Sequence, residues 1–191
     1  MKKLAKFIRI VTVAPISAII IVLGIYFFIP KSFNTFFELL LILFILGLLP
    51  ILSYPIQRTF HIIKGEQRDA ERKLAFIFCT GGYILGALIS LIFNISSLQK
   101  LVYYTYFFSG IFMFITNFFI KIKASGHMCG VAGPVAVAIY LFGYEFTFLF
   151  IIIIGLVAWS SVKLKRHKYQ ELIVGFIIPI IALLISIRIV I

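Results

Sequence analysis

The sequence predicts an all-α protein, a polytopic membrane helix bundle of six to seven transmembrane helices, from three observations. Hydrophobic residues make up 63% of the 191 residues and charged residues 13%, whereas soluble domains average roughly 45–50% and about 25%. Apolar runs near the length that crosses a bilayer recur along the chain. Basic residues gather at the ends of these runs. The length leaves no room for a sizeable soluble domain, so we expect a single transmembrane domain, residues 1–191.

Seven apolar segments follow one another along the chain, separated by polar stretches or turns. The first follows the basic start MKKLAKFIRI. It is too long for a signal peptide and no small-residue cleavage pattern closes it, so we interpret it as a span. The fifth and sixth are the shortest, and Gly130, Gly133 and Pro134 interrupt the fifth. We expect spans at about residues 7–29, 36–56, 74–95, 101–120, 128–144, 146–159 and 172–191.

This order of spans places three polar segments, 57–73, 121–127 and 160–171, on the same side as the N-terminus, because two spans separate each from the next. Of the 18 lysines and arginines, 15 fall on this side, and only Lys31, Lys100 and Arg188 on the other. The positive-inside rule then predicts that the polar side of a multi-pass cell-membrane protein faces the cytoplasm. With basic residues at span ends, the net charge of +12 favours lipid headgroups or an anionic substrate as partners over nucleic acid.

The segment KASGH carries the first candidate site. Lys123, Ser125 and His127 lie at a membrane boundary and lead into a helix. A helix N-terminus presents unpaired N–H groups that suit a phosphate, and Gly126 would let the backbone approach it. His127 could protonate a leaving oxygen. Alternatively, Ser125 is only a helix cap and His127 only an interfacial side chain.

The segment HKYQE carries the second candidate site. His167 and Glu171 are four residues apart and would share a face of a helix. A carboxylate bonded to one imidazole nitrogen makes the other more basic, which activates a histidine as base or nucleophile. The alternative is a surface ion pair that contributes little to the stability of the fold. We expect no metal and no cofactor, because acids are few and no HExxH or paired-cysteine spacing occurs. Cys79 and Cys129 lie in or near apolar runs, so no disulfide framework is expected.

The order of these segments resembles the type 2 phosphatidic acid phosphatase superfamily. Its second motif is Pro-Ser-Gly-His, which ASGH matches with Ala124 in place of proline. Its third is Ser-Arg, five residues, His, three residues, Asp. SSVKLKRHKYQE has this spacing, with Ser161 at the arginine position and Glu171 at the aspartate position. ELIVG, which follows, is similar to the family's Asp-Val-Leu-Ala-Gly.

The first family motif has a lysine or arginine followed by Arg-Pro. RDAERK offers Arg68 and Arg72 there, with Lys73 instead of proline. Lys123, four residues before His127, is similar to a divergent bacterial branch with Lys-Ile-Ser-x-His at this place. The resemblance covers roughly residues 57–175, which gives a phosphatase-like core at about 57–191.

The resemblance implies a mechanism without metal. His167 would attack phosphorus and form a phosphohistidine, Glu171 would orient it, and His127 would protonate the leaving lipid oxygen. The phosphoryl oxygens would be held by Arg68, Arg72, Lys123 and the backbone of Ser125 and Gly126. If 160–171 is helical, Lys165 lies over the same face as Ser161 and could replace the missing arginine.

The leading hypothesis is therefore a membrane hydrolase that removes phosphate from an isoprenoid or glycerolipid (di)phosphate. A lipid phosphotransferase would use the same residues, with another alcohol in place of water. The alternative from another class is a degenerate, non-catalytic protein that binds anionic lipid. A transporter is disfavoured, because charges avoid the span centres and no internal repeat is evident.

Overall fold

The structure is a computed structural model that describes the backbone of residues 1–191 and every side chain except that of Phe146. The described residues form helices and no strand, so the all-α prediction is confirmed. In chain order these are α1 (Lys2–Val11), α2 (Ala14–Phe28), α3 (Phe36–Ile42), the π-helical η1 (Leu43–Leu48), α4 (Leu49–Phe60), α5 (Gln67–Ile92), α6 (Ser97–Phe118), α7 (Gly126–Phe142), the short η2 (Tyr144–Phe146), α8 (Thr147–Lys163) and α9 (Tyr169–Val190).

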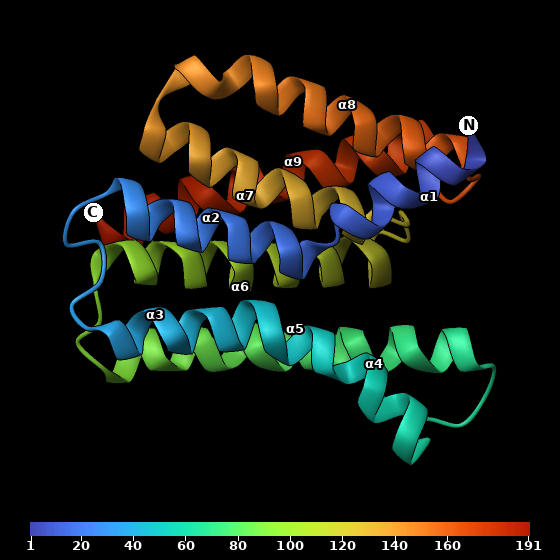
Figure 1. Cartoon of the computed structure of the whole chain (residues 1–191), viewed down its shortest axis with the longest axis horizontal. Helices are drawn as coiled ribbons and strands as arrows, with labels where there is room; N and C mark the ends of the chain where they lie inside the picture. Colours follow the sequence, from blue (N-terminus) through green and yellow to red (C-terminus); the bar gives the residue numbers. More distant parts are fainter.

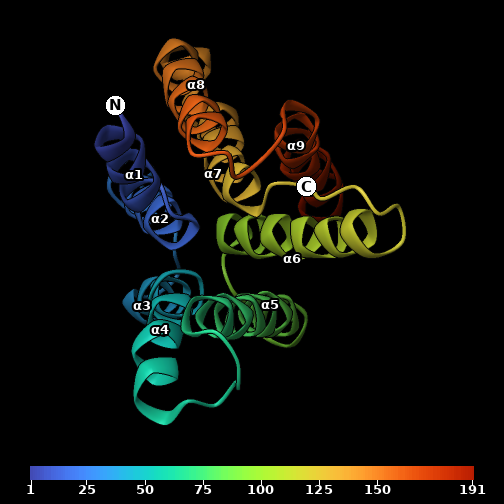
Figure 2. The ribbon, with the colours of Figure 1, turned by 90° about the vertical axis from the view of Figure 1, so that its right-hand side faces the viewer.

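Successive helical segments run in opposite directions between the two ends of an elongated bundle (Figure 1). Helix α6 lies between two groups of helices (Figure 2). Helices α3, α4 and α5 lie on one side of it, and α1, α2, α7, α8 and α9 on the other. The N-terminus lies at the end where α4 leads to α5, α6 to α7 and α8 to α9, and the C-terminus lies at the opposite end.

Four helical segments are long and apolar enough to cross a membrane: Phe36–Phe60, Gln67–Ile92, Ser97–Phe118 and Tyr169–Val190. A fifth results if α1 and α2 count as one bent span. The expected count of six to seven is not reached, because α7 and α8 have 17 residues each. At 1.5 Å per residue such a helix is about 25 Å long, against a hydrocarbon core of about 30 Å. Four to five such helices are consistent with an integral membrane protein.

The expected first span is interrupted between α1 and α2, whose axes differ by 50°. Pro15 lies at the start of α2. A proline ring clashes with the carbonyl four residues earlier, which here belongs to Val11, the last residue of α1. The bend turns α1, with its row of basic residues, across the end of the bundle toward α8.

Small residues let α7 sit at the centre of the group formed by α2, α8 and α9. At Gly130 a Cβ atom would collide with the Cβ of Ala14 at the start of α2. Pro134 is buried inside the same helix, and Val131 and Val137 are almost fully buried. This close packing fixes the N-terminus of α7, which carries the KASGH segment, against the elbow between α1 and α2.

Candidate functional site

The three polar segments and the N-terminal helix lie at one end of the bundle, as the span order predicts (Figure 1). Direct contacts join residues 121–127 to residues 160–171, and the N-terminal helix to residues 160–171. The backbone N–H of Ser125, before α7, donates to the carbonyl of Glu171 in α9 at 2.9 Å. Arg9 of α1 donates to the hydroxyl of Ser161 in α8, also at 2.9 Å. Side chains more than 150 residues apart in sequence therefore form one site.

Ser125 is the N-cap of α7, and its side-chain oxygen accepts from the N–H of Met128 at 3.3 Å. Its backbone lies directly on α9. At Gly175 a Cβ atom would come within 2.5 Å of the Ser125 carbonyl oxygen, so only glycine allows this approach. Ser125 itself is fully buried, while Gly126 is exposed at the helix N-terminus. Its exposed backbone is the part of the predicted cradle that a ligand can reach.

His167 and Glu171 form the predicted pair, with 2.7 Å between Nδ1 and Oε2. They do not share a helical face, because α9 begins only at Tyr169. Instead, Glu171 lies in the first turn and its carboxylate reaches back, also accepting from the N–H of Lys168 at 3.4 Å. With the proton held on Nδ1, the lone pair of Nε2 is available. Nε2 has no hydrogen-bond partner among the described residues.

Arg9 and Thr12 are site residues that sequence reasoning missed. Arg9 contacts Ser161, which is fully buried at the position where the resemblance leads one to expect an arginine. The hydroxyl of Thr12 lies 3.0 Å from Nε2 of His127 and donates its only proton to the carbonyl of Ile8 at 2.7 Å. Thr12 therefore accepts from Nε2–H, which leaves Nδ1 of His127 unprotonated.

Four arginines from three segments lie close enough for their charges to interact. The charges of Arg166, Arg72 and Arg68 all act on Arg9. Arg72 has only a loose pair with Asp69, at 3.9 Å between exposed side chains. Such a group of cations is suited to bind an anion. Arg166 was also missed, because its position next to His167 in the loop before α9 gave no separate signal.

The two lysines predicted to bind phosphate, Lys123 and Lys165, differ in their position relative to the site. Lys123 is exposed, and its charge acts on Glu171. Lys165 lies in the turn after α8, which ends at Lys163, and has a φ of 52°. It therefore shares no helical face with Ser161, and the condition under which it could replace the missing arginine is not met. The side chain that does contact Ser161 belongs to Arg9.

His127 precedes the apolar part of α7, which begins at Met128. Burial and the charges of Arg9 and His167 lower the pKa of His127 from 6.5 to about 4. The imidazole is therefore neutral at pH 7 when no anion is bound. An incoming phosphate would oppose the positive charges and raise this pKa, because a nearby negative charge favours the protonated ring.

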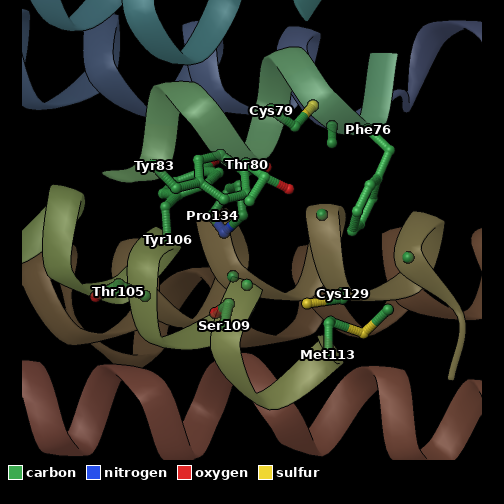
Figure 3. A pocket seen from close by; sticks show the side chains of 15 residues that line it. Phe76, Cys79, Thr80, Tyr83, Thr105, Tyr106, Ser109, Met113, Cys129 and Pro134 are labelled. Atoms are coloured by element: carbon green, nitrogen blue, oxygen red, sulfur yellow. The ribbon is translucent and has the colours of Figure 1, made fainter. Parts of the chain in front are cut away.

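Two apolar spaces flank α7. One is a cavity of about 190 Å³ between α5, α6 and α7, where side chains of α5 face those of α6 (Figure 3). It ends at the ring pair of Tyr83 and Tyr106, whose centroids are 5.4 Å apart. The other is a groove of about 560 Å³ on the opposite side of α7, between α2 and α8.

Comparisons with protein-family models, with curated proteins and with solved structures give no match. Within the described residues, no three His, Cys, Asp or Glu side chains come together as metal ligands would. The candidate site thus rests on its own geometry: two histidines, one carboxylate and an arginine cluster.

Proposed function

We propose that this chain is a membrane lipid-phosphate phosphatase that acts through a phosphohistidine on His167. The observation that carries the proposal is the pair of His167 and Glu171, with Nδ1 held at 2.7 Å and Nε2 unpartnered among the described residues. The charges of His167 and of Arg9, a member of the arginine cluster, both act on His127. A histidine activated by a carboxylate supplies a nucleophile. Fixed cations supply what phosphoryl transfer chiefly needs, namely positioning and stabilisation of charge on the equatorial oxygens.

In the first step, Nε2 of His167 attacks phosphorus and the bond from phosphorus to the lipid oxygen breaks. The lipid oxygen takes a proton from His127, which is protonated once the phosphate has entered. In the second step, water attacks the phosphohistidine, its proton passes to His127, and the bond from phosphorus to Nε2 breaks. Phosphate leaves and both histidines are restored. Arg9, Arg68, Arg72 and Arg166 would hold the phosphoryl oxygens, with Lys123 beside Glu171.

The bundle would lie in the cell membrane, with α7 from Met128 onward and α8 crossing beside the four long helices. This makes six or seven passes with the site at one membrane face. The charge asymmetry, 15 basic residues against three, supports a cytoplasmic site. A cysteine introduced near the N-terminus should then resist a membrane-impermeant thiol reagent in intact cells, and rapid labelling would contradict this orientation.

The function is tested by phosphate release from purified protein in detergent, with prenyl monophosphate, prenyl diphosphate and phosphatidic acid as substrates. His167→Asn should reduce release by at least about 10³-fold, as loss of a nucleophile does. His61→Asn is the matched control, because His61 is exposed at the same end and its φ of 48° suits asparagine. Absence of release from all three substrates would reject the enzyme and leave an anionic-lipid binder. Release that survives His167→Asn would reject the mechanism.

A further inference from the structure

The groove between α2, α7 and α8 is bounded by the elements that carry one half of the candidate site. The groove begins at Val11 and Thr12, at the bend between α1 and α2. Thr12 contacts His127, and α8 ends in the segment with Ser161. The walls are almost entirely aliphatic or aromatic, and among the described side chains that line them only Thr12 and Ser17 carry a hydroxyl group.

His127 lies on the same face of α7 as the residues that line the groove. On α7 the groove is lined by Val131, Pro134, Val135, Ala138 and Phe142. Val131, Val135, Ala138 and Phe142 follow His127 at intervals of three or four, so they lie on the same face of the helix. The cavity on the other side of α7 is lined by Gly126, Cys129, Gly130 and Gly133, and Pro134 lies at the border between the two spaces. A phosphate held at His127 therefore has its apolar chain directed into the groove and not into the cavity.

The groove is longer than one leaflet of a bilayer. From His127 to Phe142 the helix rises about 22 Å at 1.5 Å per residue. Half of a hydrocarbon core of about 30 Å is about 15 Å. A chain that fills the groove therefore continues past the midplane, which the tail of an ordinary glycerolipid, confined to its own leaflet, does not do.

An aromatic pair closes the far end. Phe28 of α2 and Phe142 of α7 meet edge to face, with ring centroids 6.1 Å apart. Gly24 forms the wall just before this pair, and a Cβ atom there would lie 3.6 Å from the Phe142 ring, in ordinary contact. The lining of the groove thus ends at the two rings.

We infer that this groove binds the chain of a lipid phosphate or diphosphate with one long apolar chain. This inference rests on the proposed function for the headgroup, and it narrows the substrate class from lipid phosphates in general to long single-chain ones. The Phe28–Phe142 pair sets the length of chain that the groove accommodates.

The test is photo-crosslinking of the full chain in detergent with phytyl phosphate carrying a diazirine at the far end of its chain. Crosslinks are expected around Phe28 and Phe142. Gly24→Leu, which fills the far part of the groove, should lower their yield by about tenfold, as a misfit of one or two methylene groups costs in an apolar pocket. Hexyl phosphate with the same diazirine should crosslink nearer Val131 and be unaffected by Gly24→Leu.

The matched control is Gly155→Leu on α8, where a Cβ atom meets open space and the residue does not line the groove; it should leave both yields unchanged. An excess of unlabelled phytyl phosphate should abolish the crosslinks, and dioleoyl phosphatidic acid should not. Crosslinks to the α5–α6 cavity, uniform labelling of the outer surface, insensitivity to Gly24→Leu, or equal competition by phosphatidic acid would each overturn the inference.

This experiment separates the two proposals. Groove crosslinks without phosphate release from any substrate would reject the phosphatase and keep the binding site. Phosphate release with crosslinks elsewhere would keep the phosphatase and reject the groove as the chain site.

Discussion

The two ends of the bundle use polar side chains differently. At the end with the C-terminus, the buried carboxylate of Glu38 accepts from the backbone N–H of Asn34 at 2.9 Å and of Ser96 at 3.4 Å. Gln99, also buried, donates to the Glu38 carbonyl at 3.3 Å. These side chains satisfy the backbone of two loops. At the other end Gln57 bonds the backbone of Ile63 in a similar way. There, however, side chains also contact side chains from distant segments, as in the pairs Arg9–Ser161 and His127–Thr12.

This difference separates stability from function. A carboxylate that satisfies backbone N–H groups replaces missing helical hydrogen bonds, so its loss affects folding. The side chains at the site end keep donors or lone pairs for a ligand: the guanidinium of Arg9 uses one of its five N–H groups on Ser161, and Nε2 of His167 is unpartnered among the described residues. Substitutions at the two ends should therefore separate in their effects, which the following predictions test.

Arg9→Ala should cause the largest loss among the variants outside the histidine pair. If Arg9 supplies the cation that is missing at position 161, kcat/KM for phosphate release should fall by about 10²–10³-fold, the usual effect of losing one donor to a developing charge. The melting temperature should change little, because Arg9 is only partly buried and makes one side-chain hydrogen bond among the described residues. Activity and melting curves measured in the same detergent provide the check.

Exchanging the residues at positions 9 and 161 tests the role of Arg9 further. Combining Arg9→Ser with Ser161→Arg returns a guanidinium to the same place from the opposite helix and should restore most of the activity that Arg9→Ser loses. Arg9→Lys should recover only part, because lysine lacks the planar fork. Lys165→Ala, in the exposed turn, should have little effect. A large loss in Lys165→Ala with none in Arg9→Ala would reverse the assignment.

At the opposite end, Glu38→Ala should lower stability and leave the specific activity of the folded protein unchanged. It removes a carboxylate that is 7% exposed and accepts from two backbone N–H groups. The expected cost is about 2–3 kcal/mol. Thermal unfolding followed by circular dichroism measures the shift. Loss of activity at full stability would show that the two ends are not separate in function.

The pH dependence of stability should report on His127 at the site end. Its pKa is about 4 in the folded protein against 6.5 ordinarily, so between these values the unfolded chain binds more protons. Stability then rises with pH across this window, and lowering the pH from 7 to 5 should cost about 2 kcal/mol. His127→Asn should remove this part of the pH dependence. Added orthovanadate should also weaken it, because a bound anion raises the pKa of His127.

The span order was enough to predict that residues 57–73, 121–127 and 160–171 share one end. In the structure, residues 121–127 and the N-terminal helix contact residues 160–171 there. The spacing of His167 and Glu171 predicted their pairing, although through the first turn of α9 and not a shared face. Arg9 could not be predicted as a partner of Ser161, because the bend at Pro15 directs α1 toward α8. The limited length of α7 and α8 was partly visible, because the fifth and sixth apolar segments are the shortest. Their exact ends could not be predicted, because helix ends depend on caps such as Ser125 and on packing around Gly130, which hydropathy does not reveal.

The most direct test of the central claim is to trap the covalent intermediate. Purified protein mixed rapidly with radiolabelled prenyl phosphate and quenched in alkali should carry label on one peptide, with mass spectrometry placing the phosphoryl group on His167. His127→Asn should both form the label and release it more slowly, because His127 donates the proton in the first step and accepts it in the second, whereas His167→Asn should form none. Phosphate release without labelling of His167, or label on another residue in the wild-type protein, would contradict the account.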